Sequence, residues 1–423
     1  MKGNISTRKK TKGDGGRTPA NRKAIPGEPL AGLKVIDASR VLAGPLSAQC
    51  LGDMGADVIK IEHPERGDDT RDWGVRIGER DTTYFYSMNR NKRSISLDYT
   101  NRKDLDVVLK LVKDADVFIQ NFKYGGAEKL GIGYEQLSKI NPRLIYCSIS
   151  GYDRHSSEKD RLGYDIVLQG ETGLMGMNGD LGQSPLKFGV AVVDLFAGLY
   201  SAQAILAALY ERDRTGLGSH VEISLYHTAV QLTAYYGLEA LAIGKDPQKW
   251  GNNHPAIVPY GVYEAADGPV VIAVGNFRQF TAFCTKVIDR PDIMEDPRFK
   301  TNLDRIKNRD IIGPLFKEEV KKFPRAELIR RMNEVDIPCG EVDGLYAAMT
   351  SKRAQENQMV CEVDHPSAGK AKVLNPPYRF HGTRSPLQRR PPMLGEHNIE
   401  ILTDVLGLGD EEVDDFMRRH HPD

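Results

Sequence analysis

The stretch LKVIDASRVLAGPLSAQCLGDMGADVIKIE, residues 33–62, decides the fold class. Its two ends, 33–38 and 57–62, are short apolar runs that predict buried strands, and 46–54 predicts a helix that follows Pro45. A strand, a short crossover helix and a second strand form a βαβ unit with parallel strands. The unit contains no G-x-G-x-x-G sequence, so it predicts no dinucleotide fingerprint.

The same alternation continues along the chain. We expect strands at 94–98, 116–121, 144–150 and 221–225, with helices at 103–113 and 134–140. Strands that alternate with helices predict an α/β fold with a mostly parallel sheet. Ligands bind such sheets at the carboxyl ends of the strands, which makes candidate ligand loops of the segments after Ala38, Glu62, Asp98, Asn121 and Ser150.

The pattern changes after residue 245. A polar segment leads to a hairpin over 263–274 that turns at Asp267-Gly268, and charged helical segments follow over 297–331. We therefore expect a second, smaller domain there. Beyond it, 360–363 and 370–374 predict strands and 399–406 predicts a terminal helix.

Composition excludes several classes of protein. Lys plus Arg equals Asp plus Glu at 58 each, so no global basic field favours nucleic acid or an anionic membrane. Five widely spaced cysteines form no zinc-ligand pattern, and they favour an intracellular chain without metal or disulfides. Residues 1–28 predict a disordered basic tail, which is either solvated or a mitochondrial targeting segment. The expected location is the cytoplasm or the mitochondrial matrix.

The stretch GVAVVDLFAGLYSAQAILAALYER, residues 189–212, raises a question about Asp194. Between 190 and 210 it is apolar or small on every side, and Asp194 is the one charged residue. This pattern predicts a buried helix, in which an ionised carboxylate costs several kcal/mol unless it is paired or protonated. Asp194 is either a structural cap or a catalytic carboxylate shielded from water. We reject a membrane span because small and polar residues dilute the run and no second such segment exists.

From Pro29 onward the chain resembles the family III CoA-transferases, a group that includes formyl-CoA and succinate–hydroxymethylglutarate CoA-transferases. The order and spacing of nine segments carry the resemblance. They are LKVIDASRVLAGP (33–45), LGDMGADVIKIEHPERGDDTR (51–71), NRNKRSISLD (89–98), DVFIQNF (116–122), GYD (163–165), GVAVVDLFAGLY (189–200), TGLGSHVEISL (215–225), IPCGEV (337–342) and PPMLGEHN (391–398).

The resemblance implies a nucleophile, a CoA site and an architecture. The family's nucleophilic aspartate matches Asp194. Its CoA contacts match Leu42, Ala43, His63, Leu97, Asn121, Phe122, Lys129, Leu162, Gly163, Tyr164 and Asp165. The family's fold implies an intertwined homodimer. Its large Rossmann-like CoA-binding domain would comprise 29–225 and 345–423, with a linker helix and loop over 226–250 and a small α+β domain over 251–344. A CoA thioester is then a substrate, and no permanently bound cofactor is expected.

Further segments resemble the succinate–hydroxymethylglutarate branch, which moves CoA between short dicarboxylic acids. They are WGNNHPAIVPYGVYEAADG (250–268), NRNK (89–92) and GDDTR (67–71). Leu42 stands where formyl-CoA transferase has glutamine, and that enzyme's glycine-rich loop has no counterpart near 250–260, which argues against formyl and oxalate as substrates. Arg71, Arg90 and His254 are hypotheses for binding the acid's distal carboxylate.

The expected reaction is CoA transfer, and two alternatives to it are considered. Asp194 would carry the acyl group as an anhydride and CoA as an aspartyl thioester, with backbone N–H groups of the 250–260 loop as candidate oxyanion donors. An α-methylacyl-CoA racemase is one alternative, although Tyr164 replaces the histidine that such an enzyme uses. Asp165 is a second candidate nucleophile, which we interpret as a structural or CoA-side carboxylate. A non-catalytic CoA-binding protein is the other alternative.

Overall fold

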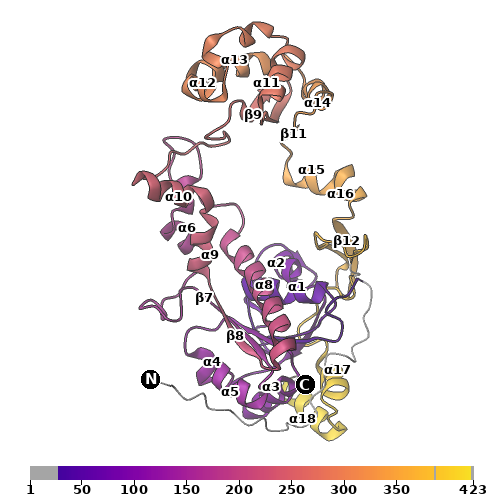
Figure 1. Ribbon diagram of the computed structural model, residues 1–423. Helices are drawn as coiled ribbons and strands as arrows, with labels where there is room; N and C mark the ends of the chain where they lie inside the picture. Colours follow the sequence, from indigo (N-terminus) through magenta and orange to yellow (C-terminus); the bar gives the residue numbers. More distant parts are fainter. Residues whose placement is uncertain (1–26, 385–386, 421–423) are drawn as a thin grey trace, which may run out of the picture. The chain divides into compact units, whose positions relative to one another are not determined.

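The structure is a computed structural model that describes residues 27–384 and 387–420. The chain forms two compact units (Figure 1). Unit 1 comprises Met1–Asp160, Leu195–Ser224 and Cys361–Asp423, and unit 2 comprises Arg161–Asp194 and Leu225–Val360. The predicted basic tail lies outside the described residues except for its last two positions, so both interpretations of it stay predictions.

Unit 1 is built on a six-stranded sheet in which every neighbouring pair of strands is parallel. The spatial order is β5-β2-β1-β6-β7-β8, which is the 3-2-1-4-5-6 order of a Rossmann fold. The expected α/β class is therefore confirmed. The strands are β1 (Lys34–Asp37), β2 (Asp57–Glu62), β5 (Lys92–Ser96), β6 (Val117–Gln120), β7 (Ile145–Ser150) and β8 (Ser219–Ser224).

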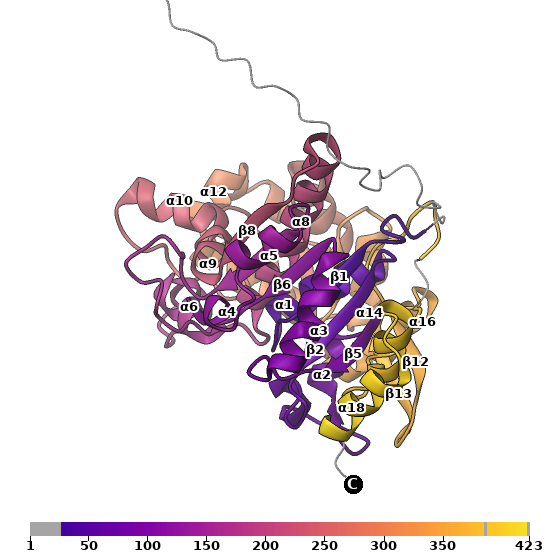
Figure 2. The same cartoon turned by 90° about the horizontal axis from the view of Figure 1, so that it is seen from below.

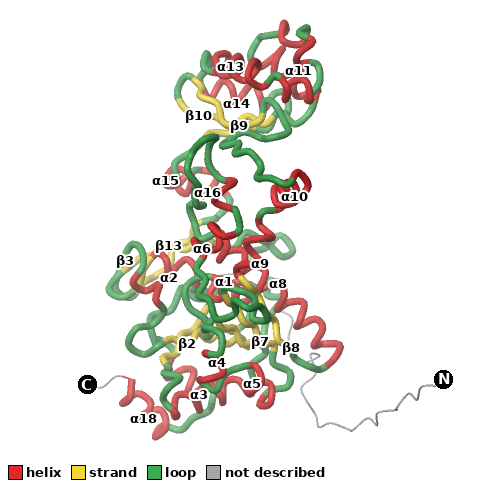
Figure 3. The backbone as a smooth tube through the Cα atoms, turned by 90° about the vertical axis from the view of Figure 1, so that its left-hand side faces the viewer, coloured by secondary structure: helices red, strands yellow, loops and turns green. Residues whose placement is uncertain are grey.

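Helices cover both faces of this sheet (Figures 1 and 3). On one face lie α3 (Arg102–Lys113), α5 (Tyr134–Ile140) and α18 (Asp410–His420), and on the other lie α1 (Ala43–Asp53) and α8 (Val192–Thr215). Helix α18 was not expected from the sequence. It docks beside the start of α3, where Arg419 and His420 both bind the buried carboxylate of Asp104.

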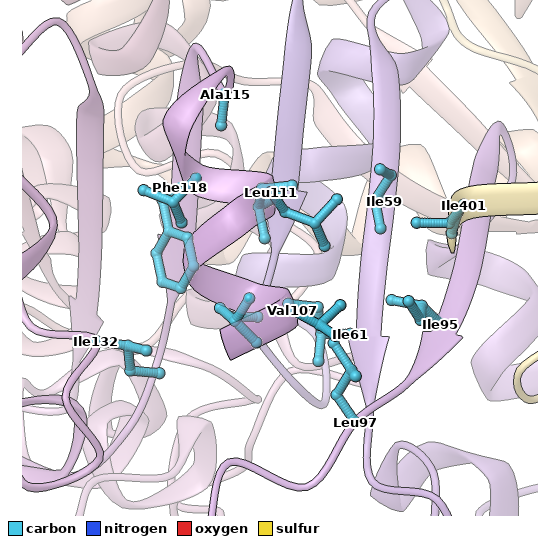
Figure 4. Close-up of a cluster of buried hydrophobic side chains, with 14 of the residues drawn as sticks. Ile59, Ile61, Ile95, Leu97, Val107, Leu111, Ala115, Phe118, Ile132 and Ile401 are labelled. Atoms are coloured by element: carbon cyan, nitrogen blue, oxygen red, sulfur yellow. The ribbon is translucent and has the colours of Figure 1, made fainter. Parts of the chain in front are cut away.

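The main core of unit 1 lies between the sheet and α3 (Figure 4). Ile59, Ile61 and Ile95 from the strands meet Val107 and Leu111 of α3, and all are buried. The C-terminal part of the chain completes this core with four side chains, Ile401, Leu402, Val413 and Phe416. The yellow C-terminal segment accordingly runs beside β2 and β5 in Figure 2.

Helix α8 differs from its prediction. Ala197, Ile205 and other residues on one side are buried, but Leu199 is 48% exposed and Tyr210 is 70% exposed. The expectation of burial on every side is therefore wrong for the single chain. By length and composition alone, α8 is apolar enough to cross a membrane, as are core helices of globular proteins. Gly198 explains its close packing on α1, because a Cβ there would lie 2.7 Å from the carbonyl oxygen of Ala43.

Unit 2 contains α6 (Asp165–Glu171), α7 (Leu174–Met177), α9 (Leu225–Leu232) and α10 (Ala234–Ile243), followed by a small α+β part. The prediction assigned 161–194 to the large domain. In the structure this segment belongs to unit 2 because α6 packs against α9. The small part contains β9 (Tyr260–Ala265), β10 (Gly268–Ala273), β11 (Cys339–Glu341), α11 (Phe277–Ala282), α12 (Asn302–Lys307), α13 (Arg309–Val320), α14 (Arg325–Asn333), α15 (Leu345–Thr350) and α16 (Lys352–Glu356). Two more strands, β12 (Val360–His365) and β13 (Gly369–Leu374), form a hairpin whose residues from Cys361 on lie in unit 1.

A buried cluster of charges holds β1, β2 and β5 together at the centre of unit 1. The Lys60 ammonium lies 2.9 Å from Asp68 and donates to the carbonyl oxygen of Ser39 at 3.0 Å. The Lys92 ammonium donates to Asp37 at 2.8 Å, and all four charged side chains are fully enclosed. Burial alone would raise the pKa of Asp37, but Lys92 and Lys60 hold that pKa below its ordinary value. The cluster is stable only as a set, because each charge compensates another.

Replacement of Lys60 by methionine tests this interdependence. Lys60→Met leaves Asp68 buried without its cation, so we expect the free energy of unfolding to fall by about 3 kcal/mol or more in urea titrations. Lys110→Met is the matched control, because Lys110 forms an exposed ion pair with Glu412 and its loss should cost less than about 0.5 kcal/mol. Equal stability of the two variants would contradict this account of the cluster.

Candidate active site

The sheet order places a ligand crevice between β1 and β6, where the chain connections turn in opposite directions. Asn121 follows β6 and joins the two loops. Its amide oxygen accepts from the N–H of Arg40 at 2.9 Å, and its amide nitrogen donates to the carbonyl oxygen of Arg40 at 2.8 Å. Leu42 and Ala43 begin α1 beside this joint, and no side chain caps the helix and no acid lies in its first turn. The N-terminus of α1 therefore suits an anion such as a pyrophosphate.

The remaining predicted CoA contacts in unit 1 lie after neighbouring strands. His63 follows β2 and its Nδ1 accepts the N–H of Glu65 at 3.3 Å. Leu97 follows β5 but is fully buried in the core, so its predicted role as a CoA contact stays a prediction. Phe122 follows β6 and packs edge-on against Tyr99, and Lys129 ends the short helix α4 (Gly126–Lys129) with its side chain exposed. The candidate loops after Ala38, Glu62 and Asn121 thus carry predicted contacts in unit 1.

The Leu162–Asp165 segment lies in unit 2, where it leads into α6. Gly163 is half-buried, whereas the side chains of Leu162 and Tyr164 are 69% and 62% exposed and are accessible to a ligand. Asp165 itself is buried. The segment therefore separates into an exposed part that suits CoA and one enclosed carboxylate.

Asp165 serves the first turn of α8. One of its oxygens accepts the backbone N–H groups of Val193 at 2.7 Å and Asp194 at 3.3 Å. Gln169 donates to its other oxygen at 2.6 Å and accepts the N–H of Phe188 at 2.8 Å. A carboxylate engaged on both oxygens is a poor nucleophile, which supports the structural interpretation of Asp165. Sequence reasoning missed Gln169, although its position one helical turn after Asp165 was a usable signal.

Asp194 lies in the first turn of α8 and is half-buried. Within the described part of the chain, neither oxygen of its carboxyl group accepts a hydrogen bond. Burial and the nearby charge of Asp165 raise the pKa of Asp194 to about 7. Near neutral pH both the acid and the carboxylate are therefore accessible, and among the described residues no cation pairs with the carboxylate, which is a state typical of reactive groups.

Arg71 does not match its hypothesis as an acid-binding residue. It is 4% exposed and makes two hydrogen bonds to Glu62, at 2.7 and 2.8 Å. It also binds Asp81 and the carbonyl oxygen of Pro392, and its guanidinium lies over the ring of Phe85. With its charge compensated inside unit 1, Arg71 is a structural residue. Sequence spacing did not reveal these partners.

Arg90 is likewise paired with a buried acid, so it does not match its hypothesis as an acid-binding residue either. It is 7% exposed, and its guanidinium donates to both carboxylate oxygens of the buried Asp53. Asn91 donates to the same carboxylate at 2.9 Å. The charge of a guanidinium paired in this way is already compensated, so the group is not available to bind a substrate carboxylate.

His254 fits its hypothesis better. It lies half-buried in unit 2, and its Nδ1 accepts the N–H of Ala256 at 3.0 Å. The proton of a neutral ring therefore lies on Nε2, which is able to donate to an acid. Of the backbone N–H groups in the 250–260 loop, those of five residues already have acceptors, namely Gly251, Asn253, His254, Ala256 and Val258. Among the described loop residues before β9, the N–H groups of Trp250, Asn252 and Ile257 remain as donors.

No group of three or more His, Cys, Asp or Glu side chains in the described ranges has a metal-binding arrangement. The polar groups of the candidate site are a carboxyl, an imidazole and backbone amides. This set suits acid–base and nucleophilic chemistry.

Comparison with known proteins assigns the chain to a family. CoA-transferase family III matches residues 30–398. The chain belongs to this family. Human succinyl-CoA:glutarate CoA-transferase is 34% identical over 92% of this chain and 89% of its own length. Succinate–glutarate CoA-transferase of Agrobacterium fabrum is 36% identical, over 89% and 96% of the two chains.

Two further comparisons add to this assignment. Acetyl-CoA:oxalate CoA-transferase of Acetobacter aceti is 35% identical over 88% of this chain and 93% of its own. A CaiB/BaiF family protein from Brucella suis has a crystal structure that superposes with a TM-score of 0.80. It is 39% identical and covers 90% of this chain and 100% of its own. This chain is thus a family III CoA-transferase, and overall identity does not separate the glutarate from the oxalate relatives.

The raised pKa of Asp194 predicts a pH-dependent cost of folding. The folded state holds the proton up to about pH 7, whereas the unfolded chain releases it near 3.8, so stability falls as pH rises through this window. Asp194→Asn removes the cost. We expect its gain in unfolding free energy to be larger at pH 8 than at pH 5 by about 2 kcal/mol, measured by urea denaturation.

Asp213→Asn is the matched control, because Asp213 lies on the same helix and is exposed. Its effect on stability should be the same at both pH values. A gain for Asp194→Asn that does not depend on pH would contradict the raised pKa.

Proposed function

We propose that this enzyme transfers CoA from succinyl-CoA to a short dicarboxylic acid, with Asp194 as its nucleophile. The observation that supports this most directly is the state of Asp194, a carboxyl group without a hydrogen-bond donor whose pKa lies near neutrality. The names of the human and Agrobacterium relatives, which pair succinate with glutarate, support the choice of donor and acceptor class.

The reaction keeps the energy of the thioester in two covalent intermediates. An oxygen of Asp194 attacks the thioester carbonyl, the carbon–sulfur bond breaks, and a mixed anhydride and CoA thiolate form. The thiolate attacks the Asp194 carboxyl carbon and releases succinate, which leaves an aspartyl-CoA thioester. The acceptor carboxylate then attacks that carbon and regenerates the thiolate with a new anhydride. Attack of the thiolate on the acceptor's carbonyl releases the new acyl-CoA and restores Asp194.

The crevice at the ends of β1 and β6 and the N-terminus of α1 support a CoA site at Leu42, Ala43, Asn121 and Phe122. Within unit 2, Leu162 and Tyr164 are exposed and stay proposed CoA contacts. Apolar residues around Asp194, such as the buried Val193, limit the access of water that would hydrolyse the anhydride. Backbone N–H groups of Asn252 and Ile257 are the proposed oxyanion donors, and His254 is the proposed donor to the acid.

A hydroxylamine trap tests the nucleophile. Incubation of the enzyme with succinyl-CoA and hydroxylamine should convert Asp194 to a hydroxamate that peptide mass spectrometry identifies. Asp194→Ala should lower exchange between labelled succinate and succinyl-CoA by about 10⁴-fold or more, since it removes the covalent route. Asp213→Ala is the control and should keep full exchange.

Full exchange by Asp194→Ala would refute the mechanism. The alternatives give other results in the same samples. An α-methylacyl-CoA racemase would exchange the α-proton of a 2-methylacyl-CoA for deuterium, and a non-catalytic CoA-binding protein would bind succinyl-CoA without label exchange.

We also propose a homodimer. Exposed apolar side chains on α10 support it, because Tyr235, Leu238 and Leu241 are 58%, 70% and 81% exposed. Sedimentation velocity at micromolar concentration should give the mass of two chains. Leu241→Lys should shift the protein toward single chains, and a wild-type monomer at these concentrations would overturn the proposal.

A further inference from the structure

The 250–260 loop is held by three side chains of the adjacent helices α12 and α13. Arg309 donates to the carbonyl oxygens of His254 at 2.9 Å and Pro255 at 2.7 Å. Asn302 donates to Ala256 at 2.7 Å, and Arg305 donates to Val258 at 2.9 Å. Four carbonyl groups of a short stretch thus face the small part of unit 2.

Arg309 differs from Arg305 in the ring that it contacts: Arg305 lies over Phe280, outside the loop, whereas Arg309 contacts a ring of the loop itself. Its guanidinium lies 4.5 Å from the centre of the Trp250 ring. A planar guanidinium is able to stack on an indole and to use both terminal nitrogens as donors at once, whereas a lysine ammonium has no such fork. One side chain therefore contacts both the Trp250 ring and the carbonyl groups of His254 and Pro255.

The charge of Arg309 is not used in an ion pair. Among the described residues, no carboxylate lies within 4.0 Å of it, and its Nε is buried without a hydrogen-bond partner. In the same unit, Arg290, Arg330 and Arg331 all pair with acids. Arg309 is half-buried, and its guanidinium donates to loop carbonyl groups instead of a carboxylate, as does that of the buried Arg305.

Hydrogen bonds and the intervening 179–188 backbone together connect this loop with Asp194 inside unit 2. The Lys249 ammonium donates to the carbonyl oxygens of Gln183 and Ser184, and the N–H of Gly251 donates to Gly179. This 178–188 segment continues to Phe188, whose N–H is bound by Gln169, the partner of Asp165. The position of the loop is thereby linked to the first turn of α8.

We infer that Arg309 is a positioning residue that sets the affinity for the acceptor acid by holding Trp250 and the backbone of His254 in place. The inference rests on the proposed function, because it assigns the loop to the acid and not to CoA. The predicted CoA contacts lie elsewhere, at the ends of β1, β2, β5 and β6 and in Leu162–Asp165. Loss of the Arg309 side chain should therefore raise the KM for the acceptor acid more than the KM for succinyl-CoA.

Steady-state kinetics of Arg309→Ala test this inequality. With glutarate as acceptor, we expect its KM to rise by about 10-fold or more while the KM for succinyl-CoA stays within about twofold, because only the acid depends on the loop. Arg309→Lys should resemble Arg309→Ala, since it keeps the charge but loses the fork and the stacking. Arg278→Ala is the matched control, because Arg278 is an exposed arginine of unit 2 that is 3.7 Å from Asp336, and it should leave both KM values unchanged.

Tryptophan fluorescence gives a measurement that does not need turnover. The sequence has two tryptophans, so Trp73→Phe leaves Trp250 as the single fluorophore. In this background Arg309→Ala should raise quenching of Trp250 by acrylamide about twofold or more, and glutarate should change the emission only in the chain that retains Arg309.

Several results would overturn the inference. Recovery of the glutarate KM by Arg309→Lys would show that charge alone suffices. Equal rises in both KM values, or unchanged quenching of Trp250, would show a general structural role or no clamp. If the wild-type chain exchanges no CoA, the proposed function fails, and the quenching measurement still decides whether Arg309 fixes the loop.

Discussion

The carboxyl groups of Asp165 and Asp194 both lie at the first turn of α8, and the site depends on the difference in the hydrogen bonds that they accept. Asp165 takes the backbone N–H groups and the amide of Gln169, so its negative charge is well supported. Asp194 receives none of these donors and lies beside that charge, which is why its pKa rises toward 7. The helix start thus has one carboxyl group that is hydrogen-bonded on both oxygens and one, the proposed nucleophile, that lacks these donors. If the donors were shared equally, Asp194 would be a stable and unreactive carboxylate.

The fold was largely predictable from local patterns. Alternating apolar runs gave the bounds of β2 and α5 without error, since strands buried on both faces read as continuous apolar segments. The spatial strand order, the final helix α18 and the exposed side of α8 were not predictable in the same way. These features depend on which surfaces meet across long separations in the chain, and the charged sequence of α18 resembles a solvated segment.

The candidate site was predictable in part. The one charge in an apolar helix identified Asp194 before any resemblance was considered, because burial of a charge has a cost that needs a reason. Arg71 and Arg90 were hypotheses for binding the acid because they lie near matching motifs. The sequence does not reveal that Glu62 and Asp81 neutralise Arg71 and that Asp53 neutralises Arg90. Arg309 gave no signal at all in a segment that is rich in charges. Side-chain partners of this kind become visible only in three dimensions.

The contribution of the C-terminal segment to the core has a consequence for biosynthesis. All six strands of the main sheet have left the ribosome once Ser224 emerges, yet Ile401 and Phe416 belong to the core beneath them. The N–H of Ser96 donates to the side chain of Asn398, so it likewise forms this hydrogen bond only after Asn398 has been synthesised. Part of an apolar face of the nascent sheet therefore stays uncovered while unit 2 is translated, and unit 1 reaches its final packing only after the segment with Phe416 has emerged.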